Sequence, residues 1–168
     1  MAQSPDAVSS SATRSFSRTL SRIAEKRFTI LASQFYEPIS RALVQGASDV
    51  LRRAGVVTRN IQLVWVPGAF ELPVVAARLA HAKRRPHAII ALGALIRGQT
   101  SQYEVIAHAV AQGLSQVAVT ATIPVTFGVV VAATPAQARA RAGGAQGNRG
   151  AEAAMAALAV LRLFETVR

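Results

Sequence analysis

The segment 91–104, ALGALIRGQTSQYE, joins an apolar run to a polar loop. Residues 87–93 are typical of a buried strand, and the residues after the loop have helical spacing. The carboxyl end of a parallel strand that feeds a helix is where open α/β sheets bind ligands. Gly98 allows a ligand to approach the backbone closely, and Thr100 can cap the helix and donate to an anion. The segment therefore predicts a phosphate or carboxylate pocket.

Three other loops of suitable chemistry follow predicted strands. Residues 33–37 (SQFYE) supply an aromatic ring, residues 67–71 (PGAFE) supply a turn with a carboxylate, and a further loop lies beyond Phe127. Because parallel strands place their carboxyl ends at one edge of a sheet, we expect these loops to converge. The result would be a ligand site with an apolar wall, a carboxylate and exposed backbone groups.

Alternating strand and helix patterns from residue 27 onward would position these loops. Apolar and β-branched runs predict strands at 28–32, 61–66, 88–92 and 123–131. Helical spacing predicts helices at 37–54, 72–82, 101–117, 135–142 and 149–164, with Gly55 ending the first and Asn148 capping the last. Strands that alternate with helices predict a four-stranded parallel sheet covered on both faces, which is a three-layer α/β/α sandwich.

The composition narrows the class of protein. A chain of 168 residues is expected to form one domain with a real core. It is 51% hydrophobic, but no apolar run approaches the ~20 residues that a membrane helix needs, so no membrane association is expected. The absence of cysteine excludes disulfides, thiolate catalysis and cysteine-ligated metals. The three histidines, His81, His87 and His108, lack metal-ligand spacing, so no metal site is expected.

The net charge is +11, and arginine supplies most of it. Such a chain can bind nucleic acid or another polyanion, or it can present a basic surface that attracts phosphorylated substrates. The charges do not cluster along one helix stripe, and only 5% of residues are aromatic and available for stacking. The second interpretation is therefore favoured, and nucleic acid is not expected as a partner.

Residues 1–26 form a separate segment rich in Ser, Ala and Arg. It lacks the apolar region of a secretory signal. Its composition fits either an organellar transit peptide or a flexible basic N-terminal tail with a short helix around residues 16–23. Asp6 and Glu25 dilute the acid-poor transit pattern, so a tail on a cytoplasmic protein is favoured, with the folded domain spanning residues 27–168.

Several motifs in the remaining chain resemble one known enzyme family. They are VPGAFELP at 66–73, ALG and IRGQT at 91–93 and 96–100, and RAG and GNRGAEAA at 141–143 and 147–154. In this order they resemble 6,7-dimethyl-8-ribityllumazine synthase, from about residue 27 to residue 163. The resemblance implies a flavodoxin-like sandwich that assembles into pentamers, in some members into sixty-subunit shells, with no cofactor and no metal. It implies condensation of 5-amino-6-(D-ribitylamino)uracil with 3,4-dihydroxy-2-butanone 4-phosphate in riboflavin biosynthesis.

The resemblance also implies that one subunit supplies most of the substrate-binding residues, namely Phe35, Ala69, Phe70, Glu71, Ala94, Leu95, Ile96, Gln99 and Thr100. Phe35 would stack on the pyrimidine ring. Residues 69–71 would hold the ribityl chain, residues 94–96 would contact the pyrimidine edge through the backbone, and Gln99 and Thr100 would face the phosphate. Without the family, Phe35 could equally be a core aromatic, and Glu71 could be a first-turn helix acid.

Two further residues would reach the site from the neighbouring subunit. Phe127 would close the aromatic slot, and Arg141 would bind the phosphate, because a guanidinium is always charged and can donate two parallel hydrogen bonds. From the residues alone, Arg141 would be assigned as a solvated cation at a helix C-terminus. The resemblance thus implies an active site shared between subunits of a homo-oligomer.

The chain departs from the family pattern at three positions. Gln102 stands where members usually carry the histidine proposed to transfer a proton, and glutamine does not titrate near neutral pH. General acid–base catalysis is worth about 10²–10⁴-fold, so we expect a slower enzyme that still gains from substrate proximity. Tyr36 stands at a common asparagine position. Ala145 stands at a common lysine position near the phosphate, which predicts weaker phosphate affinity.

Two interpretations from different classes follow. The first is an attenuated synthase, with Gln102 and Arg141 at its catalytic positions. The second is a non-catalytic paralogue that binds a lumazine or flavin, or acts as an oligomeric scaffold, and Gln102 and Ala145 favour it. Thr100 and Arg141 favour the enzyme, because a flavin-binding protein has no need of a butanone phosphate site. A basic cage that packages nucleic acid is a third, less favoured interpretation.

Overall fold

The computed structural model describes residues 23–167. Residues 1–22 of the expected tail, and most of the short helix expected near residues 16–23, lie outside the described residues. The last residues of that expected tail pack on the domain. Ile23 is 1% exposed and joins the core, and the Lys26 ammonium lies 3.4 Å from the Glu165 carboxylate. The packed domain thus includes residues before 27.

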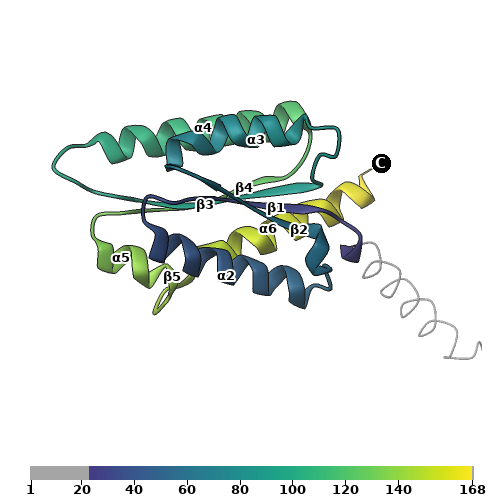
Figure 1. Ribbon diagram of the computed structural model, residues 1–168, viewed down its shortest axis with the longest axis horizontal. Coiled ribbons are helices and arrows are strands. Elements are labelled where there is room, and N and C mark those ends of the chain that lie inside the picture. The colour runs from purple at the N-terminus through teal and green to yellow at the C-terminus, as the bar shows by residue number, and fades with distance from the viewer. Residues whose placement is uncertain (1–22, 168) are drawn as a thin grey trace, which may run out of the picture.

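Strands and helices alternate along the chain as expected (Figure 1). The strands of the main sheet are β1 (Phe28–Ser33), β2 (Ile61–Val66), β3 (Ala88–Ile96) and β4 (Val125–Ala132). The helices are α2 (Glu37–Arg53), α3 (Leu72–Ala80), α4 (Gln102–Ala121), α5 (Pro135–Ala140) and α6 (Arg149–Thr166). Short 3₁₀ turns at Thr58–Asn60 and Ala69–Glu71 precede β2 and α3, and a small hairpin joins β5 (Ala142–Gly144) to β6 (Gly147–Asn148). None of the helices between residues 23 and 167 combines the length and hydropathy needed to span a membrane.

The main sheet has the strand order β2-β1-β3-β4, and every neighbouring pair is parallel. Helices α3 and α4 cover one face, and α2 and α6 cover the other (Figure 1). This confirms the predicted three-layer sandwich and its four-stranded parallel sheet. The chain moves from β1 to one side and later returns to β3 on the other side. A crevice therefore opens between β1 and β3 at their carboxyl ends, which is where doubly wound sheets bind ligands.

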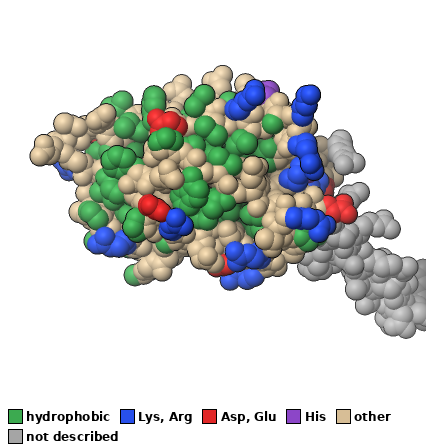
Figure 2. Space-filling view, viewed as in Figure 1, with side chains coloured by type: hydrophobic (Ala, Val, Ile, Leu, Met, Phe, Trp, Pro, Cys, Tyr) green, Lys and Arg blue, Asp and Glu red, His purple; other side chains and the backbone are tan. Residues whose placement is uncertain are grey.

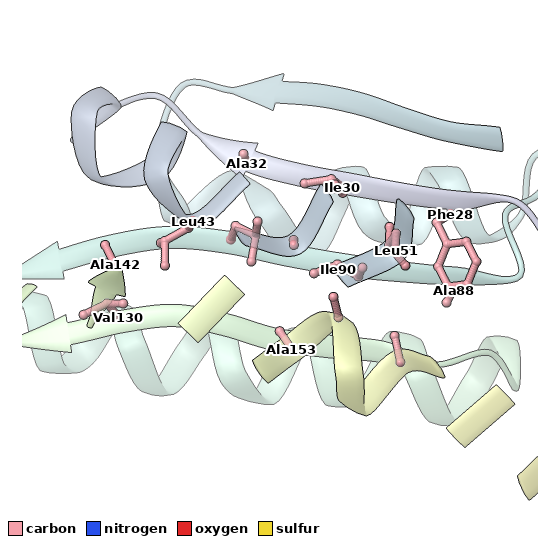
Figure 3. Close-up of a cluster of buried hydrophobic side chains, with 14 of the residues drawn as sticks. Phe28, Ile30, Ala32, Leu43, Leu51, Ala88, Ile90, Val130, Ala142 and Ala153 are labelled. Carbon is pink, nitrogen blue, oxygen red and sulfur yellow. The ribbon is translucent and has the colours of Figure 1, made fainter. Parts of the chain in front are cut away.

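Two hydrophobic clusters hold the layers together. The first packs residues of β1 and β3, including Ile30 and Ile90, against Leu43 and Leu51 of α2 and against α6 (Figure 3). The second packs the opposite face of the sheet against α3 and α4. All nine residues of β3 are buried, because the strand lies in the middle of the sheet and is covered on both faces. This central strand gives the site at its end a rigid base.

Some boundaries differ from the sequence prediction. Strand β3 continues to Ile96, whereas the sequence predicted that a loop begins near residue 93, because Leu95 and Ile96 pair with Val131 and Ala132 of β4. Helix α4 is longer than predicted and ends at Ala121; the next residue, Thr122, has a left-handed φ of 53°. The expected Gly-rich break after α5 is the β5–β6 hairpin.

Helices α2 and α6 approach closely at Gly150. A Cβ atom at this position would overlap the carbonyl group of Leu43, which is backbone and cannot rotate away. We predict that Gly150→Ala lowers the free energy of unfolding by about 2–3 kcal/mol, since overpacking a tight contact forces backbone shifts. Chemical denaturation would measure the loss. Gly98→Ala is the matched control, because a Cβ there meets no atom within 4 Å. Equal stability of the two variants would contradict this account of the contact.

The starts of β1 and β3 are joined through His87. The Arg27 amide donates to His87 Nδ1 at 2.8 Å, so that nitrogen must carry no proton, and the His87 amide donates to the Arg27 carbonyl at 2.7 Å. Burial, followed by the positive charges of Arg27 and Lys26, lowers the pKa of His87. Below the ordinary histidine pKa of about 6.5 the unfolded chain therefore binds more protons than the folded chain.

We predict that the free energy of unfolding declines as the pH falls below about 6.5. The part of this decline that is due to His87 should be absent in the His87→Gln variant. Thermal unfolding between about pH 7.5 and 5 would measure it. His81→Gln is the control, because His81 is exposed and bonds only within its own helix. If both variants keep the wild-type pH dependence, His87 is not its source.

Candidate active site

A cavity of about 360 Å³ opens at the carboxyl ends of the strands, at the crevice between β1 and β3. The loops after β1 and β2, the end of β3 and the start of α4 surround it. Its lining residues are Phe35, Tyr36, Gly68, Ala69, Phe70, Glu71, Ala94, Leu95, Ile96, Gly98, Thr100, Gln102, Tyr103 and Ile106. The predicted convergence is therefore confirmed for the loops after β1, β2 and β3. The loop expected beyond Phe127 does not line the cavity, because β4 continues to Ala132.

Most of the residues expected from one subunit line this cavity. They are Phe35, Ala69, Phe70, Glu71, Ala94, Leu95, Ile96, Thr100 and Gln102. Gln99 is exposed in the loop between β3 and α4 and is not among the lining residues. The sequence analysis missed Tyr103 and Ile106. Ile106 lies four residues after Gln102 and three after Tyr103 on α4, so it is a helix neighbour of both, and this spacing could have identified it.

The wall of the cavity is aromatic and open to solvent. The Phe35 ring is 75% exposed and the Phe70 residue is 61% exposed, which is unusual for large apolar side chains that flank a cavity. The rings of Phe35 and Tyr36 meet edge to face, with centroids 5.0 Å apart. Since folding does not bury Phe35 or Phe70, their surfaces remain available to a flat ligand or to another protein chain.

Glu71 is held in a defined position at the entry to α3. Its Oε2 accepts a hydrogen bond from the Gly68 amide at 2.8 Å, so the carboxylate closes the turn that precedes the helix. The same carboxylate lines the cavity. The two roles expected of Glu71, an acid in the first turn of a helix and a ligand-binding group, are therefore compatible. A carboxylate fixed in this way can accept hydrogen bonds from hydroxyl groups.

The N-terminus of α4 faces the cavity with polar groups. Gln102 is the first residue of this 20-residue helix, and its backbone N–H donates a long hydrogen bond of 3.4 Å to Thr100 Oγ1. Both residues line the cavity and both are exposed. The Tyr103 hydroxyl donates to Glu104 Oε1 at 2.8 Å, and this hydrogen bond raises the pKa of Tyr103. The positive end of the α4 dipole and the Thr100 hydroxyl together favour an anionic or strongly polar ligand group here.

Phe127 and Arg141 lie outside the cavity. Phe127 is the third residue of the eight-residue edge strand β4, opposite Ala91, and is only partly buried against the second core cluster. Arg141 ends α5, and its guanidinium donates to the Gln146 carbonyl at 2.7 Å and to Glu152 Oε2 at 3.0 Å. Within one chain, these two residues therefore do not meet the ligands expected of them.

A second guanidinium accompanies Arg141. Arg149 donates to the same Glu152 oxygen at 2.9 Å. The hydrogen bond from Arg149, together with the nearby Arg141 charge, lowers the pKa of Glu152, so this carboxyl group stays ionised. Two cations around one anion leave a local positive charge. Ala145, at the common lysine position, lies in the turn between β5 and β6 beside this cluster.

Comparisons with known proteins agree with this arrangement. Residues 25–165 match the profile of the family described as 6,7-dimethyl-8-ribityllumazine synthase. The chain is 38% identical over 143 residues to the 6,7-dimethyl-8-ribityllumazine synthase of Leuconostoc mesenteroides, covering 85% of this chain and 91% of that protein. It is 45% identical over 140 residues to the synthase of the same name from Gemmatimonas aurantiaca, covering 83% and 85% of the two chains.

Among solved structures, a de novo designed Rossmann-fold protein matches with a TM-score of 0.38 and 15% identity, over 67% of this chain and 90% of that chain. This likeness is too slight to add to the fold described above. The family match spans the sheet, every loop of the cavity and the Arg141 cluster. The chain belongs to the 6,7-dimethyl-8-ribityllumazine synthase family.

Proposed function

We propose that this protein is a transferase of riboflavin biosynthesis that forms 6,7-dimethyl-8-ribityllumazine. Its substrates are 5-amino-6-(D-ribitylamino)uracil and 3,4-dihydroxy-2-butanone 4-phosphate. The aromatic amine of the first condenses with the ketone of the second and releases water. Loss of the proton on C3 then expels the phosphate from C4 as an inorganic ion and leaves an enol, which tautomerises to a ketone at C3. Attack of the ribityl-bearing nitrogen on this new carbonyl closes the ring with loss of a second water.

The observation that carries this proposal is the cavity at the β1/β3 crevice. Its open aromatic wall offers a stacking surface for a pyrimidine at Phe35, and the Glu71 carboxylate can accept hydrogen bonds from ribityl hydroxyls. The backbone at the end of β3, residues 94–96, can pair with the polar edge of the pyrimidine. Gln99, Thr100 and the start of α4 would meet the phosphate of the second substrate.

We propose further that a second copy of the chain completes the site. The exposed rings of Phe35 and Phe70 leave one side of the cavity uncovered, while Arg141 and Phe127 lie elsewhere on the same chain. In a ring of subunits with head-to-tail interfaces, the Arg141 cluster of one subunit would face the cavity of the next. Arg141, supported by Arg149, would then bind the phosphate, and Phe127 would close the slot over the heterocycle.

Because Gln102 stands at the expected position of the proton carrier, another group must transfer the proton in this proposal. The Gln102 amide can orient the reacting amine by hydrogen bonding but cannot accept and release a proton. Proton transfer then falls to the phosphate group or to water, so turnover is slower than with a titrating side chain. Positioning of the two substrates supplies the remaining acceleration.

A steady-state assay with both purified substrates tests the proposal, with product formation followed by lumazine fluorescence. The protein is expected to form the product only when both substrates are present, and Phe35→Ala is expected to lower kcat/KM. Measurable lumazine binding without any turnover would instead support the non-catalytic paralogue, which the glutamine at position 102 favours.

A further inference from the structure

The end of the molecule opposite the cavity, where the strands begin, carries a group of cationic side chains. We call this group the basic end, and its members are Arg27, Arg59, Lys83, Arg84 and Arg85. Arg27 directly precedes β1, Arg59 lies in the turn before β2, and residues 83–85 lie in the turn before β3. Because these strands are parallel neighbours, their starts share one edge of the sheet. Figure 2 shows Lys and Arg side chains gathered at this end.

These cations keep their charge uncompensated within the described part of the chain. The salt bridges between residues 23 and 167 involve none of the basic end, and at this end Glu165 is taken by Lys26. Arg59 and residues 83–85 are exposed. The sequence of residues 1–22 adds three arginines and only one carboxylate, Asp6, so it cannot neutralise the group.

The basic end surrounds a groove of about 450 Å³ that is rich in hydrogen-bond donors. Its lining residues are Arg27, Phe28, Thr29, Arg59, Asn60, Gln62, Arg84 and Pro86. Arg27 is anchored there, because its Nη2 donates to the Arg85 carbonyl at 2.9 Å. Its Nε is buried and has no hydrogen-bond partner among the described residues. A buried N–H without an acceptor is costly, so Arg27 is not fully satisfied by the described residues.

We propose that the basic end binds the phosphodiester backbone of a nucleic acid. Arginine predominates over lysine here, and its planar fork suits phosphate oxygens. A protein partner would need a buried apolar anchor, but the groove is lined mainly by cations and amides, and Phe28 is 1% exposed. With no exposed ring for stacking in the groove, recognition uses the backbone and is independent of base sequence.

This inference does not depend on the proposed function, since it concerns the opposite end of the sheet. It differs from the sequence-based expectation that nucleic acid is not a partner. That expectation was based on the lack of a charged helix stripe. The charges lie in turns before three strands, and only the parallel sheet brings them together.

Fluorescence anisotropy with a labelled single-stranded RNA of about twenty nucleotides tests the proposal on the full chain. The double variant Arg59→Gln/Arg84→Gln is expected to bind about tenfold more weakly than wild type, with a salt dependence reduced by about one to two phosphate contacts. The matched control Arg97→Gln/Arg139→Gln removes the same charge at the opposite end and is expected to retain wild-type affinity. All four positions are exposed, so folding should be preserved, and circular dichroism would check this.

Two results would overturn the proposal. Equal weakening by both double variants would mean that only the net charge attracts RNA. Competition by polyglutamate as effective as that by unlabelled RNA, at equal concentration of negative charge, would assign the surface to an acidic peptide.

Discussion

Arg141→Ala is expected to raise the KM for 3,4-dihydroxy-2-butanone 4-phosphate by roughly 10–100-fold while leaving the KM for the ribitylaminouracil nearly unchanged. The reason is that a hydrogen bond to a charged group contributes about 1.5–3 kcal/mol, and a guanidinium can make two such bonds to one phosphate. Steady-state kinetics with each substrate varied in turn would measure the effect. The change in kcat should be smaller, because the phosphate is bound before and during reaction.

Arg141 also supports its own surroundings, so the control must separate binding from structure. Its side chain bonds to the Gln146 carbonyl and to Glu152, and its loss could disturb the β5–β6 hairpin. Such a disturbance would change both KM values, whereas loss of a phosphate ligand changes one. Arg139→Ala removes an exposed cation two residues away and should leave both KM values unchanged. If Arg141→Ala raised the two KM values equally, the phosphate role would be wrong.

Gln102→His is expected to raise kcat by about 10–100-fold, because a titrating group near the reacting amine restores general acid–base catalysis. The position is suited to this change: Gln102 is exposed, is the first residue of α4 and lines the cavity. The new histidine should also give kcat a pH dependence centred near its ordinary pKa of about 6.5, lowered somewhat by the helix N-terminus. The wild-type enzyme should lack this dependence.

The control for this substitution is Gln102→Asn. It retains an amide but shortens it, so it tests whether any change at this position affects turnover. We expect it to lower kcat or leave it unchanged, without a new pH dependence. An unchanged kcat in Gln102→His, with the fold intact, would show that the reaction here does not depend on a proton carrier at this position.

The fold could be predicted from the sequence because its signals are local. The β-branched runs, the Gly55 helix stop and the Asn148 cap act on neighbouring residues, and alternation of strands with helices requires a parallel sheet. The extension of β3 to Ile96 could not be predicted in this way. It depends on pairing with β4, and that partner lies more than thirty residues later in the sequence.

Only the part of the candidate site that lies within one chain could be predicted from the topology. Phe35, Glu71, Thr100 and Gln102 follow strands whose carboxyl ends must meet, so their convergence follows from topology. Tyr103 could not be predicted as a lining residue because the sequence does not fix which face of α4 turns toward the cavity. Phe127 and Arg141 were assigned by resemblance and lie outside the cavity within one chain, so their proposed roles depend on the proposed second subunit.

The basic end could not be predicted from the sequence, because its residues are far apart along the chain. Arg27, Arg59 and Arg84 are separated by 32 and 25 residues, so no local window contains them together. Each lies just before a different strand. Their clustering appears only once the sheet order is known.

The central claim is that each active site is shared between two subunits, and complementation between inactive variants tests it most directly. Phe35→Asp should inactivate the cavity side, and it should fold because this side chain is 75% exposed. Arg141→Ala should inactivate the phosphate side at low substrate concentration. Co-expressed with different affinity tags and purified as mixed assemblies, the two should recover roughly a quarter of wild-type activity, because random mixing restores that share of interfaces. Mixed assemblies no more active than the sum of the separate variants would contradict the shared site.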